Sequence, residues 1–150
     1  MLGVAFAVLA LTTACSTAPS AIPSAASSPT PSVPVPAPLA GTTWRLVSIA
    51  DVRLFGPEVT LAFTAGEISG NGGCNAFNGS YALDPQTSAL RIGDLGATKR
   101  ACAEPARGDL ENAFFAALRG AAAASLDSGG RLVLSGAGAR LVFERAPGQG

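Results

Sequence analysis

At 150 residues the chain is long enough for one domain with a hydrophobic core and too short for two of ordinary size. Ten Lys and Arg residues balance ten Asp and Glu residues, so the charge gives no argument for nucleic acid as a partner. Histidine is absent, which removes the commonest general base near neutral pH and the commonest metal ligand.

The first residues have the pattern of an export signal. An apolar run extends from Leu2 to Leu11. It is about half of the roughly 20 residues that a membrane-spanning helix needs, and it fits the apolar core of a signal peptide. Ala14 before Cys15 resembles a bacterial lipobox. We therefore predict a signal peptide over residues 1–14 and a lipid anchor, such as palmitate, on Cys15. The alternative is an ordinary signal that is cleaved elsewhere.

Residues 15–38 form a Pro/Ser/Ala-rich segment that lacks charged residues. It holds seven of the 11 prolines, and such a composition cannot bury a core. We predict a disordered linker, partly polyproline II, that holds the domain away from the membrane. A low-complexity segment without a role would have the same composition. All charged residues lie at or beyond Arg45, so the folded domain is assigned to residues 39–146 and a tail to 147–150.

The folded part has mostly β patterning. Apolar residues alternate in 42–50, with Trp44 and Leu46 on one side, and in 58–63, with Val59, Leu61 and Phe63 on one side. A turn at 65–66 precedes a short strand through Ile68. Further strands are expected at 76–83, in one or two pieces around 90–95, and in two or three pieces within 124–146 with turns at 127–130 and 135–138.

One segment, residues 104–121, predicts a helix. Apolar residues recur there at helical spacing, Pro105 suits the first turn, and Gly120 suits the end. Seven or eight short strands with one late helix indicate a mainly β (α+β) fold. We expect a small antiparallel β-barrel or curved sheet, with the helix plugging its mouth.

The stretch ISGNGGCNAFNGSY, residues 68–81, is the candidate site. Its glycines Gly70, Gly72 and Gly73 precede Cys74 and Asn75. A Walker loop would need Gly-Lys-Ser/Thr at its end, and a dinucleotide fingerprint would need a helix after the glycines. A zinc site would need more ligands, since neither Cys74 nor Cys102 lies in a C-x-x-C pair. We assign no cofactor, no metal and no catalytic residue, and interpret the loop as structural.

Several segments together resemble the META domain, the module of HslJ-type heat-shock lipoproteins and of many bacterial envelope proteins. These segments are GTTWRLVSI, TLAF, ISGNGGCNAFNGSY, LRIGDLGATKRAC, LENAFFAAL, RLVL and LVFER. The pairing of GGCN with Thr98-x-x-x-Cys102 makes the resemblance specific. It covers residues 39–145. It implies a compact antiparallel sheet or barrel with one helix and an envelope function tied to stress, and it supplies no known ligand or reaction.

Given this resemblance, we interpret Cys74 and Cys102 as disulfide partners, because exported proteins meet oxidising conditions. Two separate buried thiols are the alternative. The predicted function is a non-catalytic, lipid-anchored binding or stress-related module at the cell surface. The alternative is an inhibitor of a secreted or envelope hydrolase, either a protease or a lysozyme. We expect a monomer that contacts the membrane through its anchor and has an unidentified envelope partner.

Overall fold

The structure is a computed structural model that describes residues 33–34, 39–55 and 58–147. The predicted signal peptide, the predicted lipidation site Cys15, nearly all of the predicted linker and the end of the predicted tail lie outside the described residues. Within the described part of the chain, no helix has both the length and the hydropathy needed to cross a bilayer.

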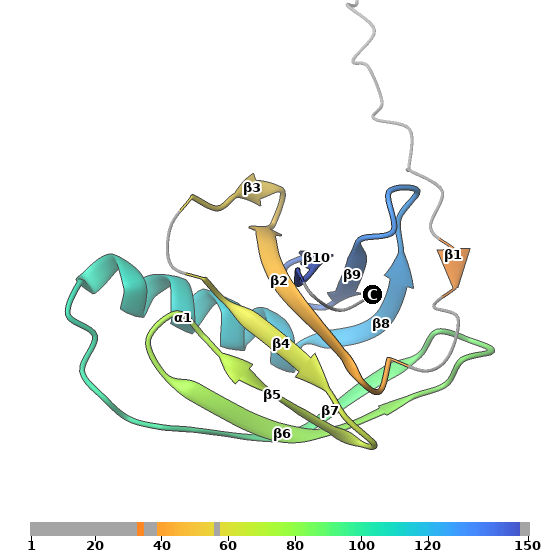
Figure 1. Ribbon diagram of the computed structural model, residues 1–150, viewed down its shortest axis with the longest axis horizontal. Helices are drawn as coiled ribbons and strands as arrows, with labels where there is room; N and C mark the ends of the chain where they lie inside the picture. The colour runs from red at the N-terminus through yellow and green to blue at the C-terminus, as the bar shows by residue number, and fades with distance from the viewer. Residues whose placement is uncertain (1–32, 35–38, 56–57, 148–150) are drawn as a thin grey trace, which may run out of the picture.

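Ten strands form one antiparallel sheet (Figure 1). They are β1 (Val33–Pro34), β2 (Thr42–Ile49), β3 (Val52–Arg53), β4 (Thr60–Phe63), β5 (Glu67–Asn71), β6 (Ala76–Leu83), β7 (Leu90–Ala97), β8 (Ala121–Leu126), β9 (Leu132–Gly136) and β10 (Leu141–Arg145). The sheet order is β1-β8-β9-β10-β2-β4-β5-β6-β7, and β3 pairs with β2. An isolated bridge between Ala89 and Ala123 brings the strands β7 and β8 together, so the sheet curls into a nearly closed barrel.

The alternation of apolar residues sets which face of each strand is buried. In β2 the side chains of Trp44 and Leu46 are buried, while Arg45 between them is exposed. In β4 the buried residues are Leu61 and Phe63, as the period of two predicts. Strands β2 and β4 pair with Trp44 opposite Leu61, which places both side chains on the inner face.

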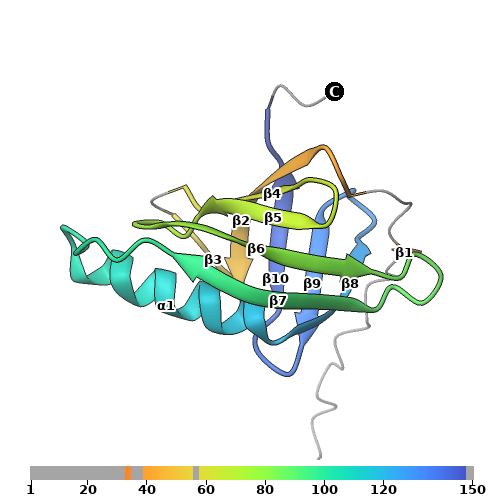
Figure 2. The same cartoon turned by 90° about the horizontal axis from the view of Figure 1, so that it is seen from below.

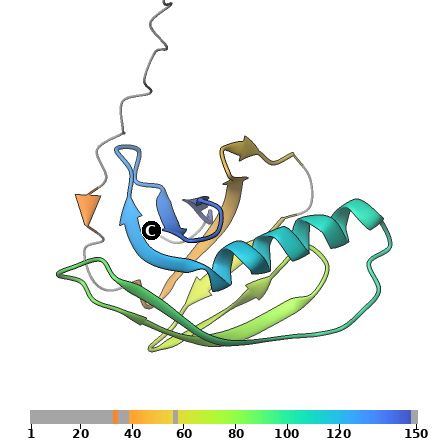
Figure 3. The same ribbon diagram turned by 180° about the vertical axis from the view of Figure 1, so that it is seen from behind.

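The helix α1 (Pro105–Arg119) lies across the opening between the two halves of the curved sheet (Figures 2 and 3). Pro105 occupies the first turn, where its missing N–H costs no hydrogen bond. The buried face consists of Phe114, Phe115, Ala117 and Leu118, together with one charged residue, Glu111. The prediction of a single late helix over the barrel mouth is therefore confirmed.

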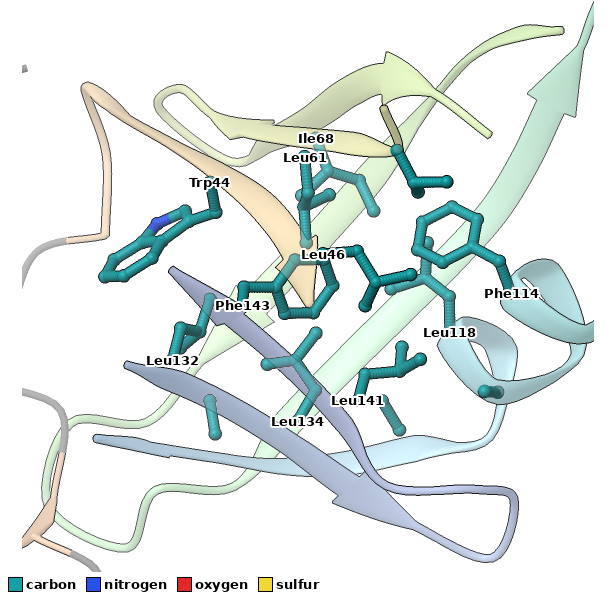
Figure 4. Close-up of a cluster of buried hydrophobic side chains, with 14 of the residues drawn as sticks. Trp44, Leu46, Leu61, Ile68, Phe114, Leu118, Leu132, Leu134, Leu141 and Phe143 are labelled. Atoms are coloured by element: carbon teal, nitrogen blue, oxygen red, sulfur yellow. The ribbon is translucent and has the colours of Figure 1, made fainter. Parts of the chain in front are cut away.

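The core fills the inside of the curled sheet and the space under α1. Side chains from both halves of the sheet and from the helix point toward one another there (Figure 4). Phe114 and Phe115 of α1 each pack within 5.5 Å of the Phe77 ring of β6, measured between ring centroids. The fully buried members include Trp44, Phe63, Phe114, Phe143, Leu61, Ile68, Leu118, Leu132, Leu134, Leu141 and Val59.

Three local details differ from the sequence prediction. The alanine-rich run after the helix is itself strand β8, because Ala121 and Ala124 fit the crowded inner face and pair with β9. Gly120 ends α1 in a right-handed conformation, with φ of −84°, instead of the left-handed cap that favours glycine. The two-residue strands β1 and β3 have too little sequence to show a period.

Replacing Trp44 by Ala should lower the free energy of unfolding by about 3–5 kcal/mol, the usual range for a large aromatic side chain in a core. The Trp44 side chain is 2% exposed, and its indole N–H donates to Thr42 Oγ1 at 2.7 Å. Guanidinium denaturation followed by circular dichroism measures the change. Trp44→Phe, which keeps most of the volume, should cost clearly less; equal stability of the Ala variant and the wild type would contradict this packing.

Candidate functional site

The glycine-rich loop connects β5 to β6 as a tight hairpin turn. Gly72 N–H donates to the Asn75 carbonyl at 2.8 Å, and Gly73 N–H donates to the Asn71 side-chain oxygen at 2.7 Å. Gly73 has φ of +113°, a conformation that L side chains rarely adopt. The loop backbone therefore turns sharply, and its next two N–H groups point toward α1.

The side chain of Glu111 receives these N–H groups. One carboxylate oxygen accepts from Cys74 N–H at 3.1 Å and from Asn75 N–H at 2.5 Å. The other oxygen accepts from the Asn75 side-chain amide at 2.8 Å. Glu111 is only 8% exposed, so its charge is removed from water and is compensated by three N–H donors. Hydrogen bonds to a charged group are the stronger kind, and a buried charge needs them.

Asn75 links this contact to a third segment of the chain. Its side-chain oxygen accepts from Thr98 Oγ1 and from Arg100 N–H, both at 2.8 Å, and its amide donates to the Arg100 carbonyl at 3.2 Å. The side chain is 4% exposed and uses its donors and its acceptor fully. We call Asn75, Thr98, Arg100 and Glu111 the polar knot, because they join the glycine loop, the end of β7 and the helix.

A disulfide joins Cys74 to Cys102 beside the polar knot, with the two Cα atoms 5.7 Å apart. It links the same loop to the segment that precedes α1. The two sulfur atoms and a Glu111 oxygen lie within 4.8 Å of one another. A metal would need thiolates, which bonded sulfurs do not offer, so this cluster is not a metal centre in the oxidised protein.

Two of the loop glycines stand where a side chain has no room. A Cβ atom on Gly72 would lie 2.9 Å from the Phe115 ring and 3.0 Å from a Glu111 oxygen. A Cβ on Gly70 would lie 2.0 Å from the Thr60 carbonyl oxygen of the neighbouring strand. These two positions therefore require glycine, because the backbone lies close to α1 at Gly72 and close to β4 at Gly70.

The sequence interpretation missed Glu111, and it placed Asn75 in a structural loop without naming its partners. A signal for Glu111 is present in the sequence. Glu111 precedes Phe114, Phe115 and Leu118 by three, four and seven residues, which places a carboxylate on the apolar face of the helix. Such a residue needs a buried partner, and a glycine-rich loop with free N–H groups is a suitable one.

A second buried carboxylate, Asp127, holds the turn between β8 and β9. It accepts from the backbone N–H groups of Gly129 and Arg131, and Arg131 Nε donates to it at 2.7 Å. Burial acts to raise the pKa of Asp127, but these hydrogen bonds and the Arg131 charge hold the pKa below its usual value. This carboxylate too is used to fix a turn.

Among the surface cavities of the described residues, two lie apart from the polar knot. One has a volume of about 380 Å³ and is lined by Arg45, Arg53, Glu58, Arg131 and Glu144 among others, with the exposed Phe55 at its edge. Arg45 forms an ion pair with Glu144 in this cavity. The other cavity, of about 530 Å³, lies between β7 and the end of α1.

Comparison with known proteins agrees with the resemblance seen in the sequence. A family model described as META domain matches residues 37–148. The chain belongs to the META domain family. Among curated proteins, none matches the chain.

Solved structures of similar fold support the same assignment. An NMR structure of a protein from Burkholderia xenovorans is 30% identical, with a TM-score of 0.58, and the match covers 73% of this chain and 84% of that one. A second NMR structure is 24% identical with a TM-score of 0.54 over 69% of this chain and 87% of the other, which shows likeness of fold.

Substituting Glu111 by Gln should lower the free energy of unfolding by about 2–4 kcal/mol, since a neutral amide offers one acceptor oxygen to three donors and leaves buried N–H groups unpaired. Chemical denaturation measures the loss. Asp109→Asn, an exposed change on the same helix, is the matched control and should stay within about 0.5 kcal/mol of the wild type. Equal effects of the two changes would contradict the role of Glu111.

Reducing the disulfide should lower the melting temperature without unfolding the domain, because the sheet and the helix keep their core. The bridge spans a sequence separation of 28 residues, for which the chain-entropy model gives about 3–4 kcal/mol. Cys74→Ser and Cys102→Ser should lose similar amounts, and the double variant no more than either single one. Additive losses, or two free thiols in protein taken from its native compartment, would argue against the bridge.

Proposed function

We propose that this META domain protein is a non-catalytic binding module of the bacterial envelope, of the HslJ type, with a stress-related role. Cys15 carries the lipid anchor, and the Pro/Ser/Ala-rich linker separates the domain from the membrane. Support comes from the family match and from the lipobox-like Ala14-Cys15 that follows an apolar run.

One observation carries the non-catalytic part of the proposal. Glu111 and Asp127, the buried carboxylates of the described residues, both accept hydrogen bonds from backbone N–H groups of turns. A general acid or base must be free to exchange a proton with a substrate. In this domain the carboxylates with the most unusual surroundings hold the fold together, and the only cysteines described are bonded to each other.

A binding module needs a concave surface with polar and aromatic side chains, and a cavity on the outside of the barrel offers one. The cavity beside β2 and β3 presents arginine side chains next to Phe55, which is 89% exposed. Arginine and aromatic side chains are the residue types that contribute most to recognition of partners. We expect the protein to act as a monomer that contacts a partner in the envelope.

Cys15→Ser should release the protein from the membrane fraction or block its processing. The reason is that in the mature wild-type protein the lipid on Cys15 is the proposed link between the domain and the bilayer. Fractionation and intact-mass analysis of the mature protein measure this. Ser16→Ala, next to the anchor, is the control and should leave partitioning unchanged. An unmodified Cys15 in the wild type, or cleavage beyond it, would show that the anchor is absent.

The hydrolase-inhibitor alternative is separated by a direct assay. Purified protein should leave lysozyme and a panel of secreted proteases fully active at equimolar and excess concentration. Tight inhibition of any of these enzymes, lost on substitution of the exposed Phe55, would replace the binding-module proposal with that of an inhibitor.

A further inference from the structure

The barrel is closed incompletely between β7 and β8. One bridge joins Ala89 to Ala123, and Ala124 N–H donates to the Ser88 carbonyl at 3.0 Å. Beyond these contacts β7 pairs only with β6 among the described residues, so the rest of its outer edge has no strand partner. Figure 2 shows β7 running along this opening toward α1. An unpaired strand edge presents N–H and C=O groups to any extended chain that reaches it.

The cavity of about 530 Å³ lies beside β7. Strand β6 contributes residues 80–82 to its lining, β7 contributes residues 90–93 including Arg91, and Arg119 and Ala121 complete it. Both arginines are exposed, and in the described part of the chain neither forms an ion pair. The Arg119 guanidinium lies 5.7 Å from the centre of the Phe115 ring, which helps to fix it at the cavity. Both arginines line the cavity, and a guanidinium group is complementary to a carboxylate.

The strand changes shape at the same place. The pairing of β6 with β7 shifts register around Ser80, so that two residues of β7, Gly93 and Asp94, oppose it. A Cβ on Gly93 would lie 2.2 Å from Ser80 Oγ, so a side chain there would displace the Ser80 hydroxyl. Bulges bend a strand, and they occur often at sheet edges and beside active sites.

We propose that the free edge of β7 binds an extended, acidic peptide segment of a partner protein by strand addition, with a peptide carboxylate held between Arg91 and Arg119. This inference rests on the proposed binding function and names its surface and its partner class. In strand addition the backbone hydrogen bonds give affinity and the side-chain pockets give specificity. Here the unpaired backbone of β7 would supply the affinity, and Arg91 and Arg119 would supply the specificity.

The chain itself shows that this region accepts a short added strand. On the other side of the opening, β1 pairs with β8, with Val33 opposite Leu126 and Pro34 opposite Ser125. Two residues suffice to form that pairing, although β8 is paired along its other side with β9. The edge of β7 is longer and is the one flanked by two unpaired arginines.

The test uses the mature lipidated chain in non-ionic detergent and a short peptide of alternating valine and threonine with one central glutamate. Calorimetric titration should show saturable binding, and the largest amide shifts in NMR spectra should map to residues 91–95. Arg91→Gln and Arg119→Gln should each weaken binding by about tenfold, the effect expected for loss of a charge-assisted hydrogen bond. Because both side chains are exposed, the variants should keep the melting temperature of the wild type.

Matched controls separate strand addition from simple attraction of an anion. Arg53→Gln removes an arginine from the other cavity and should leave affinity unchanged. A peptide with N-methyl groups along the edge-facing side cannot form the ladder and should not bind, and the glutamine version should bind about tenfold more weakly. Equal binding of the N-methylated peptide would mean that the arginines attract only a carboxylate, which would overturn strand addition.

Failure of this inference can be told apart from failure of the proposed function. Absence of binding by the peptide, or amide shifts that map elsewhere, overturns the β7 edge as the site. Dimerisation of the free chain through β7, seen by light scattering, would also overturn it, because a second copy would then be the occupant. Photo-crosslinking of the anchored protein in its own envelope is the separate arm. Partners captured from positions near Phe55 and not from position 91 would leave the binding module standing and remove only the β7 site.

Discussion

The carboxylate of Glu111 is the interaction on which the rest of the domain depends. It brings together the β5–β6 turn and α1, which are separated by more than 30 residues of sequence, as the separation of 36 between Asn75 and Glu111 shows. A charge with so little exposure to water is tolerated only because three N–H donors surround it. The loop glycines follow from the same contact, since a side chain at Gly72 would occupy the space of Phe115 and of Glu111 itself.

The polar knot also affects the surface beside β7, because it helps to set the position of α1. Glu111 lies near the middle of α1, and its contact with the β5–β6 turn helps to hold the helix over the mouth of the barrel, where Phe114 and Phe115 pack against Phe77. The C-terminal end of the helix brings Arg119 to the cavity beside β7. The helix covers the mouth of the barrel, and beyond the contacts of Ser88 and Ala89 with β8 the outer edge of β7 has no strand partner among the described residues. The position of α1 is thus related both to the buried contact of Glu111 and to the edge of β7.

The sequence predicted the sheet, the late helix and the buried Trp44, because these depend on local periods: two along β2 and β4, and about 3.6 along α1. It could not predict the partners of Asn75, since Thr98 and Arg100 are adjacent to it only after β6 and β7 have paired. The sequence shows Glu111 as a carboxylate on an apolar helix face, but it does not show which residues it contacts, because that depends on the tertiary structure. The cavity at β7 depends on a bulge and on the position of Arg119, and no periodic pattern in the sequence predicts either of them.

Opposite charges have different roles in this domain. The buried acids, Glu111 and Asp127, bind backbone N–H groups inside, where a carboxylate matches several donors at once. The arginines lie outside, where Arg45 and Arg140 pair with acidic residues, while Arg91 and Arg119 form no ion pair with any residue that the structure describes. A chain with zero formal net charge can therefore present a locally positive edge, because part of its negative charge is enclosed by the fold. The zero net charge gives no argument for nucleic acid as a partner, and it carries no information about an acidic peptide, whose recognition depends on where the charges lie.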